Sequence, residues 1–329
     1  MKQLSSCEMG SLTYEPDFAR QLAAFKVYRL HITLIALQNA VLPEFQGSML
    51  RGAFLSAFRA LNCTARISCL ACNSRTSCLY HHLFEARLPK HELRSMQDIP
   101  PPIVLQPPLK STASCSKGDR LIFSMTLFGS TVKYLPEIIR ALKEMGERGL
   151  GVRRAKFKLE AVESLGQIVF HSSEGRLHRC FPLNSSDLVG EDSVLSDTVQ
   201  LESLTPLRLK SQGTLQSKLS FEILVRALIR RSSALMTLYG PNPLDFDWGY
   251  ICQDIQNISS RALTQEWHEL IRYSNRQHAK LKMGGVMGVW QFRGNLRHYA
   301  PLLHFGSQVG VGKSCMFGLG QYRINWLRG

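Results

Sequence analysis

The sequence predicts an α+β protein in which two halves of the chain repeat one order of strands and helices. Segments of alternating apolar and polar residues, typical of half-buried strands, are separated by segments with apolar residues at helical spacing. Hydrophobic residues make up 44% of the 329 residues, which is enough to build a core in each half.

The first half contains one complete set of these elements. In chain order they are a strand at 25–37, a helix at 46–61, a proline-rich extended segment at 100–108, a strand at 120–132, a helix at 134–145 and a strand at 157–165. The order strand, helix, strand, strand, helix, strand predicts a ferredoxin-like (RRM-like) domain. We place this domain at residues 23–172, after an N-terminal extension at residues 1–22.

The second half repeats this order. Its predicted elements are a strand at 198–210, a helix at 220–239, strands around a basic stretch at 272–282, a helix at 297–305 and a strand at 321–327. The sequence therefore predicts a second ferredoxin-like domain at residues 197–329. A polar linker at residues 173–196 joins the two domains.

The charge of the chain predicts a polyanionic partner. The chain has 40 Lys and Arg residues against 25 Asp and Glu residues, and the segment from Arg261 to the C-terminus has ten basic and two acidic residues. Nucleic acid is favoured over membrane, because no amphipathic basic helix or lipidation motif accompanies this charge. The sequence starts without the apolar region of a signal peptide and has no run of 18 apolar residues, so we expect a cytoplasmic protein without a membrane partner.

Four of the nine cysteines fall within sixteen residues and predict a metal site. They are spaced C-x5-C-x2-C-x5-C, and are Cys63, Cys69, Cys72 and Cys78. In a cytosolic chain such a cluster is more typical of metal binding than of disulfides. Four thiolates suit zinc, with an iron–sulfur cluster as the alternative, inserted in the first domain at residues 63–78. We expect the metal to be structural, because four protein ligands leave no open position for a reacting water.

A glycine-rich stretch from His304 to Ile324 predicts contact with a phosphate backbone. Its five glycines surround Lys313 and Ser314, and glycine lets a main chain approach a ligand closely. The stretch does not fit a nucleotide-binding P-loop, because Ser307 stands where the first glycine belongs and a helix precedes the loop. A tight structural turn before the last strand is the alternative.

Basic and aromatic residues interleave at 272–282, a pattern that can bind phosphates and stack on bases. The residues that we expect to contact nucleic acid are Arg51, Arg272, Arg276, Lys280, Lys282, Gly310, Gly312, Lys313, Ser314, Gly318 and Gly320. For Arg51, at the start of the first helix, a solvated arginine is the alternative.

Two adjacent histidines, His81 and His82, follow the cysteine cluster directly after Tyr80. Consecutive side chains of an extended chain point in opposite directions, so we expect one of the two histidines to face a given cleft. The alternatives are metal ligation in place of a cysteine and a plain surface pair.

Taken together, these stretches resemble the RAMP superfamily of CRISPR-associated proteins, in particular the endoribonucleases that process precursor CRISPR RNA. The matching stretches are L-R-G-A-F at 50–54, E-R-G-L-G-V-R-R-A-K-F at 147–157, R-Y-S-N-R-Q at 272–277 and the glycine-rich stretch. The resemblance covers most of residues 25–326 and agrees with a cysteine knuckle after the first helix.

The resemblance implies an RNA-binding endoribonuclease that cleaves the repeats of a CRISPR precursor transcript to give mature guide RNAs. It implies attack by the ribose 2′-hydroxyl without a catalytic metal or other cofactor, leaving a 5′-hydroxyl and a 2′,3′-cyclic phosphate. His82 or His81 would act as acid or base with Tyr80 assisting, and Lys313 and Arg276 would contact phosphates. The implied partners are the precursor RNA, the mature guide RNA and other effector subunits.

One departure from the family leaves an alternative open. The histidine that the family carries in its first helix is replaced here by Ser56. This replacement favours a catalytically inactive RAMP subunit that binds one end of the guide RNA in an effector complex. A zinc-stabilised protein-interaction module without RNA is a third interpretation, which leaves the excess of basic residues unexplained.

Overall fold

The computed structural model describes residues 16–65, 67, 69, 71–85, 99–110, 113–190, 196–274 and 279–327. The chain forms two compact units. Of the described residues, those at 26–85 and 99–183 form the N-terminal unit, and those at 16–25 and 184–327 form the C-terminal unit.

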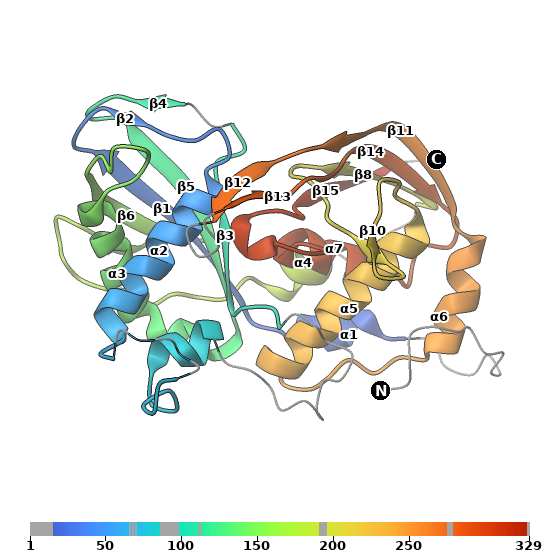
Figure 1. Ribbon diagram of the computed structural model, residues 1–329. Coiled ribbons are helices and arrows are strands. Elements are labelled where there is room, and N and C mark those ends of the chain that lie inside the picture. Colours follow the sequence, from blue (N-terminus) through green and yellow to red (C-terminus); the bar gives the residue numbers. More distant parts are fainter. Residues whose placement is uncertain are drawn as a thin grey trace. The chain divides into compact units, whose positions relative to one another are not determined.

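The N-terminal unit is a ferredoxin-like domain with one added strand (Figure 1). Its main elements are β1 (Val27–Ala36), α2 (Gly47–Asn62), β3 (Ile103–Gln106), β5 (Arg120–Phe128), α3 (Leu135–Arg148), β6 (Phe157–Ser164) and β7 (Gln167–His171). The strands form an antiparallel sheet in the order β3-β5-β1-β6-β7, and β2 (Ala40–Val41) pairs with β4 (Ser114–Cys115) outside it. Both helices cover the same face of the sheet (Figure 1).

The periodicity of the sequence explains why this unit folds. In β1, Leu30, Ile32 and Leu34 are fully buried, while His31 between them is exposed. In α3 the buried residues recur at helical spacing and include Ile138, Leu142 and Met145. The predicted strand at 120–132 ends earlier, at Phe128, because Gly129 adopts a positive φ of 56° and opens a 3₁₀ turn, η2 (Gly129–Tyr134).

The C-terminal unit repeats the fold. Its main elements are β8 (Thr198–Ser203), α5 (Phe221–Tyr239), β11 (Ser259–His268), β14 (Gly285–Arg293), α7 (Ala300–Val309) and β15 (Tyr322–Leu327). The sheet order β11-β14-β8-β15 is the ferredoxin-like order again, so the prediction of two tandem ferredoxin-like domains is confirmed. Smaller elements fill the connections: β9 (Lys210–Ser211), β10 (Thr214–Leu215), α6 (Trp248–Asp254), η3 (Ile255–Asn257), β12 (Ile271–Ser274), β13 (Ala279–Lys282) and η4 (Cys315–Phe317).

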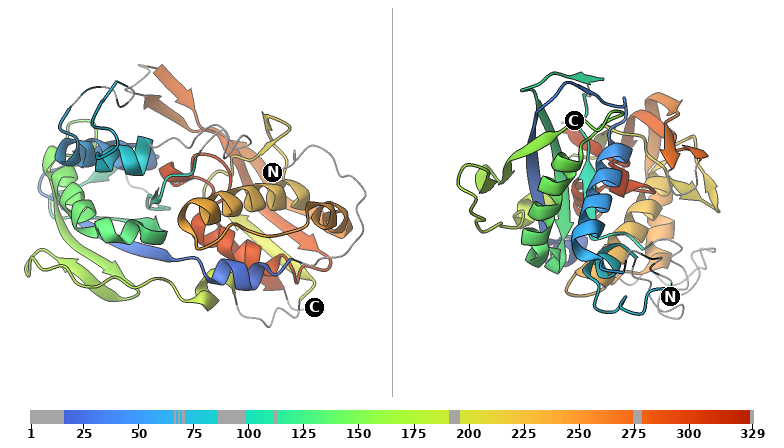
Figure 2. Two further views of the ribbon diagram at one scale, coloured as in Figure 1. Left: turned by 90° about the horizontal axis from the view of Figure 1, so that it is seen from below. Right: turned by 60° about the vertical axis from the view of Figure 1, so that its left-hand side comes forward.

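Helix α1 (Phe18–Ala23) of the expected extension, and the part of the expected linker from Asn184 onward, belong to the C-terminal unit. This helix precedes the first domain in sequence, yet it packs against α7 and α4 (Ser185–Val189), as Figure 2 shows for α1 and α7. Phe18 and Leu22 are buried, and the ring of Phe25 lies 5.5 Å from that of Phe305. The C-terminal unit therefore includes a segment that precedes the N-terminal unit in sequence. Its main part begins at Asn184, earlier than the boundary expected at residue 197.

No described helix has the length and apolar character needed to span a bilayer.

Candidate nucleic-acid interface

The histidine pair lies in a short helical turn, η1 (His81–Glu85), and not in an extended segment as expected. The turn is anchored by Phe84, whose ring lies 6.4 Å from Phe54 and 5.3 Å from Phe58 on α2. Leu83 is buried beside it. This anchoring leaves His82 exposed and His81 half-buried, so His82 is the better candidate for contact with a substrate.

The ring next to His82 is that of Tyr134, which the sequence did not indicate, and a lysine lies against the Tyr134 ring in turn. The His82 ring lies 6.3 Å from that of Tyr134 in an edge-on arrangement. The Lys133 ammonium lies 4.8 Å from the centre of the Tyr134 ring, a distance typical of a cation–π contact. An imidazole, a phenol and an ammonium are thus gathered at the start of α3, and these are groups that can move protons and stabilise negative charge.

Tyr80, which we expected to assist catalysis, is a core residue. Its side chain is only 7% exposed, its ring lies 5.6 Å from Phe84, and the Arg59 guanidinium lies 5.6 Å from its centre. Burial raises the pKa of the Tyr80 phenol, with a further contribution from Glu85. Tyr80 packs in the core against the η1 turn, and Tyr134 replaces it as the candidate catalytic phenol.

The position of the missing family histidine is on the exposed face of α2. Ser56 is exposed, and its hydroxyl accepts a weak hydrogen bond from Arg148 Nη1 at 3.5 Å. Arg51, one and a half turns earlier, is half-buried. The Arg51 charge acts on the Tyr80 phenol, whose pKa it lowers against the effect of burial.

The four cysteines are not arranged as a metal centre in this structure. They are half-buried and unbridged, and the described residues include no set of three or more Cys, His, Asp or Glu side chains positioned to bind a metal ion. Burial, then the charge of Glu85, raises the pKa of Cys69, and Cys63 and Cys78 are close enough to add to this effect. Cys63, Cys69 and Cys78 thus lie near one another, and the metal stays a prediction.

The glycine-rich loop follows α7 and uses several of its amides within the protein. Val311 donates to the Gly320 carbonyl at 2.9 Å, Lys313 to the Arg208 carbonyl at 2.9 Å, and Gly320 to the Pro206 carbonyl at 3.1 Å. These three amides therefore cannot also bind a phosphate. The expectation that the main chain of the loop holds the nucleic acid is corrected to this extent.

The glycines allow close packing. Gly312 and Gly320 have φ of 82° and 78°, and a Cβ at either position would overlap a carbonyl, that of Arg208 or that of Val311. Gly310, Gly318 and Gly320 are buried, whereas Gly312, Lys313 and Ser314 are half-buried. The loop is thus a tight turn, as the alternative interpretation had it, and its partly exposed centre carries the lysine. Contact of this lysine with a phosphate stays a prediction.

The basic residues of the β12–β13 hairpin lie beside this loop through one contact. The Arg272 guanidinium lies 4.8 Å from the centre of the Phe317 ring in η4. Lys280 and Lys282 are exposed on β13, and Arg276 lies outside the described residues. The structure therefore joins Arg272 to the loop, while the two lysines extend the positive charge along the hairpin.

Two further arginines support the loop and were missed in the sequence. The Arg231 guanidinium donates two hydrogen bonds, of 3.1 and 2.7 Å, to the Val309 carbonyl at the end of α7. Arg208, in the connection after β8, accepts the Lys313 amide on its carbonyl and donates from Nη1 to the Gly284 carbonyl. The only sequence signal for them is their charge.

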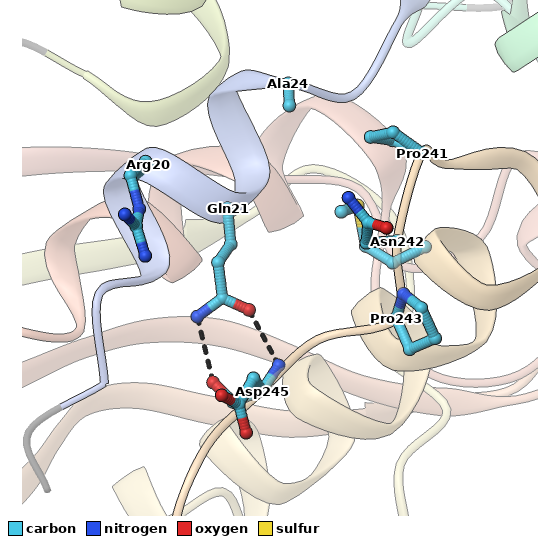
Figure 3. Close-up of a pocket in the computed structure, with 8 residues that line it drawn as sticks. Arg20, Gln21, Ala24, Pro241, Asn242, Pro243 and Asp245 are labelled. Atoms are coloured by element: carbon cyan, nitrogen blue, oxygen red, sulfur yellow. Dashed lines mark hydrogen bonds between the residues drawn. The ribbon is translucent and has the colours of Figure 1, made fainter.

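A pocket of about 370 Å³ lies elsewhere in the C-terminal unit, between α1 and the loop that follows α5 (Figure 3). Gln21 spans it by two hydrogen bonds to the main chain of Asp245, of 2.8 and 2.7 Å (Figure 3). None of the residues predicted to contact nucleic acid lines this pocket. It marks where the N-terminal segment packs on the unit.

Comparison with known proteins agrees with the fold. Residues 201–322 match the family model of the CRISPR-associated endoribonuclease Cas6, and residues 25–180 match a model described as an N-terminal domain. An uncharacterized protein of Archaeoglobus fulgidus is 25% identical over 296 residues, which cover 86% of this chain and 92% of that protein.

Solved structures show the same architecture. Thermus thermophilus Cas6 aligns over 92% of this chain and 100% of its own, with a TM-score of 0.53 and 13% identity. A Cas6 product complex aligns over 90% and 98%, with a TM-score of 0.55 and 16% identity. A Cas6-RT-Cas1–Cas2 complex aligns over 93% of this chain and 47% of the matched chain, with a TM-score of 0.55 and 14% identity. At these identities the likeness concerns the fold.

Two tandem ferredoxin-like units are the architecture that this chain shares with these Cas6 structures. The Cas6 family model matches part of the C-terminal unit, residues 201–322.

Proposed function

We propose that the protein is an endoribonuclease that cleaves the repeats of a CRISPR precursor transcript into mature guide RNAs. The observation that carries the proposal is the exposed His82 with the Tyr134 ring beside it and Lys133 against that ring. The partners would be the precursor RNA and the mature guide RNA, with other CRISPR proteins as further partners. Cas6 proteins in the matched structures are described as a product complex and as part of a Cas6-RT-Cas1–Cas2 complex.

The three side chains match the needs of 2′-hydroxyl attack. A base removes the proton of the ribose 2′-hydroxyl, whose oxygen then bonds to the adjacent phosphorus while the bond to the 5′-oxygen breaks. His82 would take or return a proton, Tyr134 would orient the phosphate or donate to the leaving oxygen, and Lys133 would stabilise the added negative charge. The products would be a 2′,3′-cyclic phosphate and a 5′-hydroxyl.

The basic C-terminal unit would hold the RNA. Phosphate contacts by Arg272, Lys280, Lys282 and Lys313 would supply affinity that falls with salt.

A structural zinc at the four cysteines stays part of the proposal. Elemental analysis of the purified protein tests it, and a protein without stoichiometric metal would remove it.

The second candidate is a catalytically inactive subunit that keeps the guide RNA bound. Ser56 at the position of the family histidine favours it, because a hydroxyl does not titrate near neutral pH. In this case the basic loop and hairpin would have their role, and the His82 group would have none.

A cleavage assay with repeat RNA separates the two candidates. We expect wild type to cut the RNA in the presence of EDTA, and a His81→Ala/His82→Ala variant to bind it with unchanged affinity and leave it uncut. Binding without cleavage by the wild type would support the inactive subunit. Full cleavage by the double variant would assign the chemistry to other residues.

A further inference from the structure

Two half-buried arginines beside the glycine-rich loop carry charge that nothing in the described protein neutralises by contact. Arg208 and Arg272 are both half-buried, and the Nε atom of each is buried without a hydrogen-bond partner among the described residues. Burial lowers the pKa of both guanidinium groups. Leaving a buried donor without a partner costs free energy, more so when it carries charge.

The nearby carboxylate does not pair with them. Within the described part of the chain Glu269 forms no ion pair with Arg208, although its charge raises the Arg208 pKa. Its two oxygens accept hydrogen bonds from the Gly284 amide at 2.8 Å and from Trp267 Nε1 at 3.3 Å. The undescribed residues 275–278, Asn-Arg-Gln-His, contain no carboxylate either. The positive charge at the base of the hairpin is therefore in excess.

Both guanidinium groups are also held in place. Arg208 Nη1 donates to the Gly284 carbonyl, and the Arg208 main chain is bound by the Lys313 amide. Arg272 lies over the Phe317 ring at 4.8 Å. Stacking uses the face of a guanidinium and leaves the N–H groups at its edge, which is the geometry that binds a phosphate.

The N-terminal unit shows that the fold does not require these charges. There, the amide of Val152, next to Gly151, donates to the Val41 carbonyl at 3.2 Å, in the connection after the first strand. In the C-terminal unit the amide of Lys313, next to Gly312, donates to the Arg208 carbonyl in the same way. The same backbone hydrogen bond is thus formed between two valines in the N-terminal unit and between a lysine and an arginine in the C-terminal unit.

We infer that Arg208 and Arg272 form a contact site for the phosphate backbone of the RNA, at the base of the β12–β13 hairpin beside Lys313. This site rests on the proposed function for its ligand. It assigns a binding role to Arg208, which belongs to the connection after β8 and not to the glycine-rich stretch. An RNA phosphate would balance the positive charge of each guanidinium through the Nη groups at its edge.

The test measures binding of a short single-stranded repeat RNA as a function of salt. Arg208→Val copies the valine of the N-terminal unit, and Arg272→Gln removes the second charge. We expect each to weaken binding about 10-fold and to lower the salt slope by about 0.7, as expected for one lost phosphate contact. The control is Arg323→Gln on β15, an exposed arginine paired with Glu202 at 2.6 Å, which should change affinity less than about twofold.

A second measurement is independent of RNA cleavage. Inorganic phosphate, compared with chloride at equal ionic strength, should raise the melting temperature of the wild type and of Arg323→Gln, but not of Arg208→Val. If Arg208→Val and Arg272→Gln behave as Arg323→Gln does in both measurements, the site is wrong. A wild type that binds RNA through these arginines but never cuts it would leave the site standing and remove only the proposed catalysis.

Discussion

The two ferredoxin-like units contain the same loop between their second helix and their last core strand, with different side chains. In the N-terminal unit the loop starts with Gly149 and Gly151, at φ of 90° and 76°, and in the C-terminal unit with Gly310 and Gly312, at 79° and 82°. The main-chain contact to the connection after the first strand is also shared. The backbone of the loop is thus a property of the fold.

The difference between the loops lies in chemistry. Val152 in the first loop is 79% exposed and Val41 beneath it is 56% exposed, and neither can bind a phosphate. Lys313 and Arg208 occupy the corresponding positions in the second. The glycines of this loop are therefore needed for the fold in both units. Contact with RNA is expected only from the charged side chains around the loop of the C-terminal unit. The predicted catalytic group lies in neither loop.

The largest effect is expected from His82→Ala. Removing a positioned acid or base lowers a rate by about 100-fold or more, while the RNA, held by the C-terminal unit, should bind as before. Single-turnover cleavage of repeat RNA measures this rate. His81→Ala is the matched control, because His81 is the half-buried neighbour of His82 in the same turn and its loss should leave the cleavage rate nearly unchanged. Equal losses in both variants would mean that the helical turn, and not His82 alone, is needed.

The next largest effect concerns the shared backbone. Gly151→Ala and Gly312→Ala each place a Cβ against a carbonyl, of Val41 or Arg208, at a positive φ. We expect both to lower the free energy of unfolding by about 2–4 kcal/mol, measured by urea denaturation.

Gly52→Ala on α2 is the control for the glycine variants. Nothing lies within 4 Å of the added Cβ, and alanine is the better helix former, so a stabilisation of up to about 1 kcal/mol is expected. A loss at Gly312 without a loss at Gly151 would show that the two loops are not equivalent.

A smaller effect is expected where the loops store strain. Arg154 and Ser314 are non-glycine residues at φ of 51° and 65°. Arg154→Gly and Ser314→Gly should each stabilise the protein by about 0.5–1 kcal/mol, since the gain from relieved strain is partly offset by the greater entropy of an unfolded glycine. Thermal unfolding measures the change. Destabilisation in either variant would mean that the side chain itself has a role in packing.

Sequence reasoning found the parts of this fold that local periodicity determines. The alternation in β1 and the spacing in α3 predicted both elements to within a few residues. It missed β11, whose residues are nearly all exposed, because no apolar alternation marks such a strand. It also could not assign Phe18 and Leu22 to the C-terminal unit, since that packing joins segments far apart in the chain.

The candidate site was predictable only as a set of residue types. The histidine pair, the lysine and the arginines stood out by their chemistry, but Tyr80 and Tyr134 could not be ranked without their burial. Arg208 carries no motif of its own, and its importance follows from a contact with a loop about a hundred residues away. Local patterns thus found the functional regions, and tertiary contacts decided which residues in them are exposed.

The smallest effect is expected from a half-buried histidine of the C-terminal unit, which makes the stability of that unit depend on pH. His304 on α7 is half-buried, its Nε2 accepts a hydrogen bond from Trp326 Nε1 at 3.2 Å, and burial lowers the pKa of its imidazole. The unfolded chain, with a histidine pKa near 6.5, then binds the proton more readily than the folded unit, so stability falls as pH drops below that value. When the pH is lowered from about 7.5 to about 5.5, the melting temperature of His304→Gln should fall by less than that of the wild type. If the two lose equally, the acid sensitivity lies elsewhere, and the buried histidine of the C-terminal unit is only a packing residue.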